Sequence, residues 1–390
     1  MHFFDHNAAT PLDPRVFEAM RPFFGLSFGS TLSLHRYGEA ARQAVETARG
    51  QVAALIGASS EEVVFTGNGT EASNMAIKGM ARAYEKRGRH IIVSSIEHQS
   101  VLYPTKTLER QGFEVTRVPV NRRGLVDPGD VQRALREDTI LISLMYASDE
   151  IGTVQPLRDI CTLAHEQDIP VHSDAVCAAG VIPVDVMNLE VDALTLSPQH
   201  MSGPTGVGAL YIRDGVRIRP LLEGGVQEGG RRGGHENIPA IAGFGVAAEL
   251  ACTEMEDRTE RVTTLREHLH RELAGHIDGI RLNGHPEHRL PGHLSLTIRD
   301  AESESMVLML DAQDIAVSLG SSCSSQASKP SHVLLAIGLS PREAQSTLPI
   351  TLGYTNTVQD IDCLVKALPD VVMRLRQIAG SAGIPTSNNQ

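Results

Sequence analysis

The chain has 390 residues, of which 41% are hydrophobic and 21% charged, a composition typical of a globular protein rather than a disordered or fibrous one. Its formal net charge of −12 argues against a general binder of nucleic-acid backbones, and no run of roughly 18 uninterrupted apolar residues predicts a membrane span. The N-terminus has no secretion-signal pattern, so we expect a cytoplasmic protein.

Short apolar runs alternate with helical patterns between about residues 60 and 215. The pattern predicts strands near 62–66, 90–96, 113–120, 139–147, 170–175, 191–197 and 207–212, and helices near 70–88, 100–112, 128–136 and 157–167. Such alternation is typical of an α/β domain with a mostly parallel sheet covered by helices on both faces. Ligands of these sheets bind beyond the carboxyl ends of the strands.

A long helix is predicted over residues 238–275, leading out of this domain. Beyond it the pattern predicts a smaller α+β domain, with strands near 293–298, 314–318 and 348–352 and helices near 303–311, 331–337 and 358–377. We therefore predict a large domain over residues 15–258 and a small domain formed by residues 1–14 together with 259–380. Residues 381–390 are predicted to be a flexible tail.

Polar residues follow three of the predicted strands. His98, Asp174 and Ser197 each come directly after a strand, and in a parallel sheet they converge on one crevice. Taken alone, each of these three residues is more simply explained by a structural role. The turn that holds Gly69 and Thr70 opens a helix and suits an anion, although Thr70 as a helix N-cap explains it equally well.

The five cysteines are widely spaced and have no metal-site pattern, so they are expected to be reduced thiols. Cys323 lies in a loop of small polar residues, where a thiol is either an accessible nucleophile or an incidental surface group. A glycine-rich loop with Arg231 and Arg232 suits a phosphate, a subunit interface or simple flexibility.

Taken together, these segments resemble cysteine desulfurases, which belong to the class V aminotransferases within the fold type I pyridoxal-phosphate (PLP) enzymes. The matching segments cover nearly the whole chain: residues 5–16, 44–66, 69–79, 149–157, 172–186, 203–213, 320–325 and 332–340. In this family a lysine forms an imine with PLP, a histidine stacks on its ring and an aspartate pairs with the pyridine nitrogen. A mobile cysteine then takes sulfur from the substrate cysteine, leaving alanine and a persulfide.

The resemblance assigns family roles to six residues of this chain. It implies that Gly69, Thr70 and Ser197 bind the phosphate, His98 stacks on the ring, Asp174 pairs with the pyridine nitrogen, and Cys323 carries the persulfide.

Six other positions depart from the family pattern. His200 replaces the imine-forming lysine, Gln199 the preceding histidine, Asp149 the ring-oxygen asparagine, Cys177 a glutamine, His235 a phosphate-binding threonine, and Pro349 the arginine that holds the substrate carboxylate. An imidazole has no primary amine and cannot form the imine, although His200 can still act as an acid or base.

These departures predict a divergent desulfurase-like protein of sulfur metabolism that handles sulfur as an accessory protein or acts on another ligand. One alternative is an active desulfurase-like sulfurtransferase or lyase with noncovalent PLP and a Cys323 persulfide. The other is a metal or cluster site built from His98, Cys177 and His200, with Asp174 and Cys323 as further ligands. The resemblance also implies a homodimer in which His235 approaches the partner's site, a sulfur-acceptor protein near Cys323, and an amino acid as the small-molecule ligand.

Overall fold

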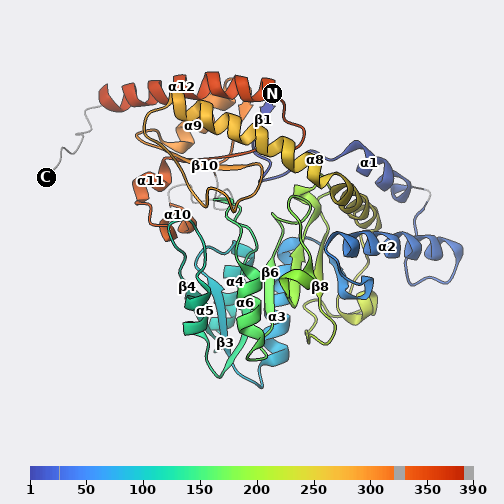
Figure 1. Ribbon diagram of the computed structural model, residues 1–390. Helices are drawn as coiled ribbons and strands as arrows, with labels where there is room; N and C mark the ends of the chain where they lie inside the picture. The colour runs from blue at the N-terminus through green and yellow to red at the C-terminus, as the bar shows by residue number, and fades with distance from the viewer. Residues whose placement is uncertain (26, 320–329, 382–390) are drawn as a thin grey trace.

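The computed structural model describes residues 1–25, 27–319 and 330–381 (Figure 1). Its largest sheet has seven strands in the order β2-β8-β7-β6-β5-β3-β4. In that order the strands are Val63–Thr66, Gly208–Ile212, Ala193–Leu196, Val171–Asp174, Thr139–Ser143, His90–Ser94 and Glu114–Val118. β8 is antiparallel to both of its neighbours and all other pairs are parallel. The predicted mostly parallel sheet is therefore confirmed.

Twelve α-helices and four short 3-10 helices are present in the described part of the chain. The α-helices are α1 (Pro14–Met20), α2 (Arg36–Leu55), α3 (Gly69–Tyr84), α4 (Gln99–Glu109), α5 (Pro128–Ala134), α6 (Leu157–His165), α7 (Val186–Leu189), α8 (Ile238–His276), α9 (Ser303–Asp311), α10 (His332–Ala336), α11 (Pro341–Gln345) and α12 (Val358–Ser381). The 3-10 helices are η1 (Arg21–Phe24), η2 (Ser60–Glu62), η3 (Pro198–His200) and η4 (Gln227–Gly230).

Helices bury both faces of the large sheet, as the strand sequences require. Leu141 of β5 packs in the core that α3 and α4 cover, whereas the next residue, Ile142, packs in the core that α2, α6 and the first half of α8 cover. Because alternate side chains of a strand point to opposite faces, a strand covered on both sides is apolar throughout. The three central residues of β5, 140–142, are all apolar, and all five residues of the strand are buried.

A second core lies around a three-stranded antiparallel sheet of order β12-β10-β9. Its strands are Thr347–Thr351, His293–Ile298 and Ile280–Leu282, and the second half of α8 packs on it together with α9 and α12. A separate two-stranded parallel sheet joins β1 (His2–Phe3) to β11 (Ile315–Ala316), which brings the N-terminus beside this part (Figure 1). Among the strands and α-helices, β1, β9, α1, α2, α7 and α11 were not predicted from the sequence.

The 39-residue helix α8 connects the two cores (Figure 1). Among the described residues it is the one helix whose length and hydropathy would suit a membrane span, and 56% of that apolar window is buried inside the protein. Its apolar first half packs against α1 and α2. The apolar character of α8 is thus accounted for by burial in the core.

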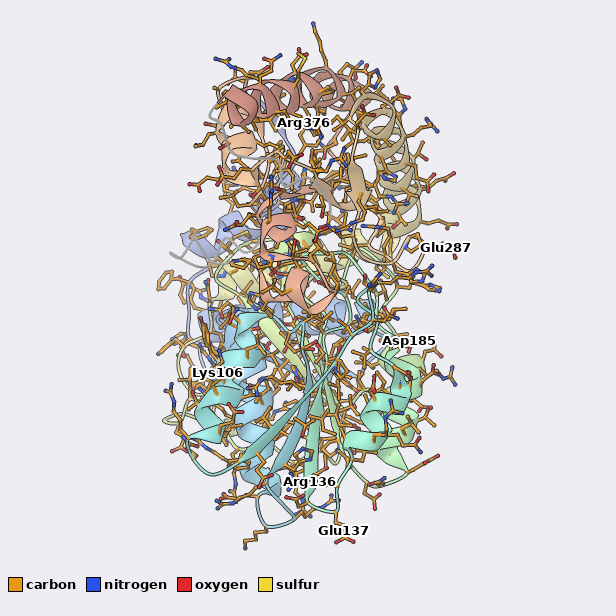
Figure 2. The ribbon with its side chains drawn as sticks, turned by 90° about the vertical axis from the view of Figure 1, so that its left-hand side faces the viewer. Lys106, Arg136, Glu137, Asp185, Glu287 and Arg376 are labelled. Carbon is orange, nitrogen blue, oxygen red and sulfur yellow. The ribbon has the colours of Figure 1, made fainter. Side chains whose placement is uncertain are left out.

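The two ends of the large sheet differ in what surrounds them. Figure 2 shows Arg136 and Glu137, which precede β5, projecting at the end of the molecule opposite Arg376 of α12. The carboxyl ends of the parallel strands therefore face the second core, where a ligand is expected. The domain boundaries stay a prediction, and the predicted tail lies, apart from Ser381, outside the described residues.

Candidate active site

A cavity of about 450 Å³ lies at the carboxyl ends of the parallel strands. It brings together nine of the residues that the sequence singled out: Gly69, Thr70, His98, Asp149, Asp174, Cys177, Ser197, Gln199 and His200. The polar residues that follow β3, β5, β6 and β7 thus converge on one site, as expected of a parallel sheet.

The N-terminus of α3 forms one wall of this cavity. Asn68, and not Thr70, is the N-cap, because its side chain accepts a hydrogen bond from the backbone N–H of Glu71 at 2.8 Å. Thr70 is exposed, and Gly69 is buried behind it. A Cβ at Gly69 would lie 2.9 Å from a methyl group of Val176, so glycine permits the close approach. A helix start of this kind suits a phosphate group.

His98 and Asp174 are linked through one serine. His98 caps α4 by accepting a hydrogen bond from the Ser100 backbone N–H at 3.1 Å, and the Ser100 hydroxyl lies 3.3 Å from a carboxylate oxygen of Asp174. The other Asp174 oxygen accepts from the Val176 backbone N–H at 3.0 Å. Burial raises the pKa of Asp174, while the nearby His98 opposes the rise. A buried carboxylate of this kind fits a protonated pyridine nitrogen.

Two further carboxyl groups line the cavity and were missed by sequence reasoning. Glu97 is fully buried and accepts a hydrogen bond from the Met145 backbone N–H at 3.0 Å, and Glu150 accepts from the Ser331 hydroxyl. Burial raises the pKa of each glutamate to about 8. Both side chains are therefore mostly protonated at neutral pH. The only sequence signal for them is that each adjoins a predicted site residue.

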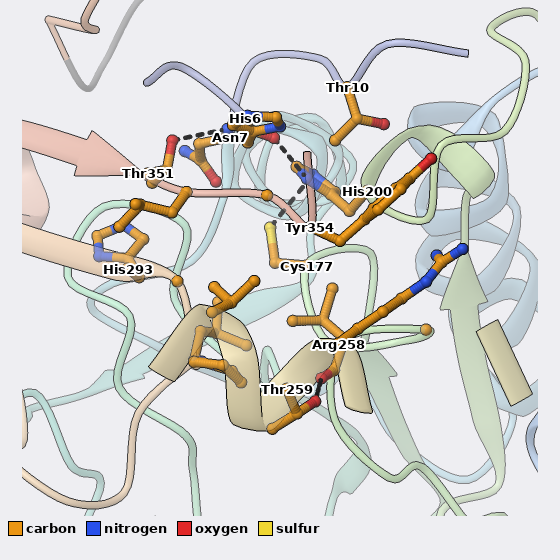
Figure 3. Close-up of a pocket in the computed structure, with 18 of the residues that line it drawn as sticks. His6, Asn7, Thr10, Cys177, His200, Arg258, Thr259, His293, Thr351 and Tyr354 are labelled. Carbon is orange, nitrogen blue, oxygen red and sulfur yellow. Dashed lines mark hydrogen bonds between the residues drawn. The ribbon is translucent and has the colours of Figure 1, made fainter. Parts of the chain in front are cut away.

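His200 stands at the end of η3, where its ring is held from two sides (Figure 3). Nδ1 lies 3.2 Å from the backbone carbonyl oxygen of His6, and Nε2 lies 3.6 Å from Sγ of Cys177 and 3.3 Å from Nε2 of Gln199. Burial lowers the pKa of His200. The imidazole is thus neutral and fixed in orientation.

A smaller cavity, of about 100 Å³, adjoins the first and shares Asn7, Cys177 and His200 with it (Figure 3). Among the described residues that line the two cavities, Arg258 is the one lysine or arginine. Its guanidinium pairs with Glu254 at 2.6 Å and lies 4.1 Å from the centre of the Tyr354 ring. No free cation from the described residues is therefore available in the large cavity to hold a substrate carboxylate.

Three of the singled-out positions do not line this site in the described structure. His235 is exposed in the glycine-rich loop and lies outside both cavities. Arg232 of the same loop forms an ion pair with Glu71 at 2.9 Å. Pro349 is buried in β12 opposite Ser295 and lines neither cavity. Cys323 lies outside the described residues.

The metal or cluster alternative gains no support from this geometry. In the described ranges, no three histidine, cysteine, aspartate or glutamate side chains converge in a way that would hold a metal ion. His98, Cys177 and His200 share the cavity without forming a ligand set.

Comparison with known proteins identifies the family. The class-V aminotransferase family matches residues 2–364. A cysteine desulfurase IscS from Dictyoglomus turgidum is 46% identical over 97% of this chain and 96% of its own length. The chain belongs to the cysteine desulfurase family.

Further similar proteins agree in sequence and in fold. A cysteine desulfurase IscS from Methanosarcina thermophila is 44% identical over 97% of this chain and 93% of its own length. A solved NifS-like protein superimposes with a TM-score of 0.88 at 35% identity, covering 97% of this chain and 99% of that one. The structure of SspA in complex with cysteine gives a TM-score of 0.82 at 35% identity, covering 92% of this chain and 100% of that one. The fold type I assignment and a place in sulfur metabolism of the desulfurase type are thus confirmed.

Proposed function

We propose that this chain is a sulfur-handling member of the cysteine desulfurase family that works without a covalent bond between lysine and PLP. One observation carries the proposal: an imidazole, His200, occupies the cavity at the family's lysine position, and no lysine of the described residues lines it. Lys106, on α4, is exposed and lies with its Nζ 5.2 Å from the centre of the Tyr103 ring. Lys329 lies outside the described residues.

The remaining cavity residues fit PLP as a noncovalent ligand. The start of α3 at Gly69 and Thr70 suits its phosphate, Asp174 suits its pyridine nitrogen, and His98 stands where the family stacks a ring on the cofactor. When bound, PLP supplies an electron-accepting ring. His200 would then serve as the acid or base beside it through Nε2.

The visible absorbance spectrum tests the proposal. Wild-type protein mixed with PLP is expected to lack the absorbance of a lysine-bound cofactor. The matched variant His200→Lys restores a primary amine at the same place and is expected to gain that absorbance. A lysine-type spectrum in the wild-type protein, or release of alanine and sulfide from cysteine at ordinary enzymatic rates, would overturn the proposal.

The second candidate is an active enzyme with noncovalent PLP, favoured by the linked pair Asp174 and His98. It predicts that PLP at 100 times its dissociation constant stabilises the fold by about 2.7 kcal/mol. Thermal melting with and without PLP measures this, and Asp174→Ala is the control expected to lose most of the shift. An unchanged melting temperature at saturating PLP would contradict this second candidate, and the accessory role would then be the one that stands.

We further propose a cytoplasmic homodimer that passes sulfur to an acceptor protein near Cys323. The family membership supports a dimer and an acceptor in general. The exposed position of His235 is compatible with an approach to the partner subunit's site.

A further inference from the structure

Cys177 and His200 form a directed pair in the cavity wall (Figure 3). The sulfur of Cys177 lies 3.6 Å from Nε2 of His200, within reach of a hydrogen bond to sulfur. Cys177 follows β6, and His200 follows β7 at the end of η3; these two strands are neighbours in the sheet. The sheet order itself therefore brings the thiol and the imidazole together.

The other ring nitrogen determines which partner donates. A backbone carbonyl only accepts hydrogen bonds, so Nδ1 of His200, 3.2 Å from the His6 carbonyl oxygen, carries the proton. In a neutral ring Nε2 is then the acceptor. The amide of Gln199 donates to Nε2 at 3.3 Å, and the thiol of Cys177 is the second donor. This is the arrangement of a nucleophile, a base and a group that orients the base.

A small molecule can reach the pair. Cys177 and His200 line both the cavity of about 450 Å³ and the cavity of about 100 Å³, and Cys177 is partly exposed. By contrast, Cys161, on α6, is fully buried in the core. The structure thus distinguishes a cysteine at a ligand site from a cysteine that only fills space.

The surrounding charges select the kind of chemistry. Asp149 and Asp174 are the charged groups that act most strongly on the Cys177 thiol. They would disfavour the negative oxygen that develops when a thiol attacks a carbonyl group, since such an oxygen needs hydrogen-bond donors or cations around it. Attack on a sulfur atom creates no such oxygen. The site therefore suits a sulfur electrophile with a cationic group.

We propose that Cys177 and His200 form a thiol–imidazole pair that accepts a sulfane sulfur from a small persulfide. Nε2 of His200 takes the thiol proton as the Cys177 sulfur attacks the outer sulfur of the donor. The sulfur–sulfur bond of the donor breaks, and the donor leaves as a thiolate that takes the proton from His200. The products are the donor thiol and a persulfide on Cys177, with no net oxidation or reduction.

The resting pair is neutral, which makes the base necessary. Burial, with Asp149 and Asp174, raises the pKa of Cys177 well above its usual value, and burial lowers the pKa of His200. Without proton transfer to His200, very little thiolate is present at neutral pH. The step needs no cofactor and goes beyond the proposed function, because it holds whether or not the cavity binds PLP.

Freshly prepared cysteamine persulfide is the probe for this step, since its ammonium group suits an acidic cavity. The cofactor-free protein is treated briefly, and each cysteine peptide is followed by mass spectrometry for the mass of one added sulfur atom. In the wild-type protein Cys177 is expected to gain sulfur faster than the exposed Cys252. In His200→Gln, which keeps the side-chain size but cannot take the proton, the Cys177 rate is expected to fall about a hundredfold while the Cys252 rate is unchanged.

Equal Cys177 rates in the wild-type protein and in His200→Gln would overturn the proposal. The proposal would also be overturned if Cys177 of the wild-type protein gained sulfur no faster than Cys252 does. This comparison needs no variant. Cys161 serves as the folding control, because a buried thiol reacts only when the chain unfolds. A failure of PLP to bind would contradict the noncovalent-cofactor candidate alone and would leave these rates unaffected.

Discussion

At the scale of single residues, burial decides the charge of Glu97 and Glu150. Each has its pKa raised to about 8 in the folded protein, against an ordinary value near 4.5. Between these values the folded state binds more protons than the unfolded state, so their contribution makes stability fall as pH rises. His6, with its pKa lowered to about 4, has the opposite effect, but only below about pH 6.5.

We therefore expect the free energy of unfolding to fall as pH rises from about 6.5 to 8. Of the three residues discussed, only Glu97 and Glu150 make stability depend on pH in this range. The slope from one such group is at most about 1.4 kcal/mol per pH unit. Glu97→Gln keeps the shape of the protonated acid and is expected to flatten this slope, as measured by denaturant unfolding at several pH values. A slope that is unchanged in the variant would show that Glu97 is ionised in the folded protein.

Apart from the family resemblance, the sequence was informative about single residues only where the sheet imposes their position. His98, Asp174 and Ser197 could be placed together because parallel strands end at one edge. The contact between His200 and the His6 carbonyl joins residues 194 positions apart, and no local pattern encodes it. The Asn68 cap in place of Thr70 shows the same limit at short range, since the sequence GNGT offers two capping side chains.

At the scale of elements, the close packing of α8 on α2 depends on one glycine. A Cβ at Gly245 would lie 2.6 Å from Cα of Ala48 and would also clash with the side-chain oxygen of Gln51. Gly245→Ala is therefore expected to push the helices apart and to destabilise the fold by about 1 to 3 kcal/mol.

Gly275 provides a matched control in the same helix. It is exposed, and a Cβ there meets nothing within 4 Å. Gly275→Ala is expected to stabilise the protein by up to about 1 kcal/mol, because alanine favours the helix. Thermal melting of the two variants should give shifts of opposite sign, and shifts of the same sign would contradict the packing of α8 on α2.

The elements themselves were largely predictable. The strands of the large sheet and the helices between them follow from periodicity, since burial on both faces leaves long apolar runs. The three-residue strand β9 and the five-residue helix α11 were missed because so few residues carry little periodic signal. Their formation depends on β10 and on neighbours distant in sequence.

At the scale of the whole molecule, large apolar side chains stand exposed at the end of η1 and between η1 and α2. Leu34 is 98% exposed, and Phe24 and Phe28 are 69% and 65% exposed. A group of this kind usually marks an interface. We expect Leu34→Asp combined with Phe28→Asp to shift the protein from dimer to monomer in sedimentation velocity. Met187→Asp, at a site 70% exposed on α7, is the control expected to leave the dimer intact. A wild-type monomer would contradict the expectation.

The proposed function depends on the absence of a lysine bond to PLP at the cavity. The most direct measurement is to add PLP, reduce the mixture with borohydride, and map the modified peptides by mass spectrometry. We predict no stoichiometric modification of any lysine in the wild-type protein and complete modification at position 200 in His200→Lys. Stoichiometric attachment of the reduced cofactor to a single wild-type lysine, Lys329 included, would contradict the account.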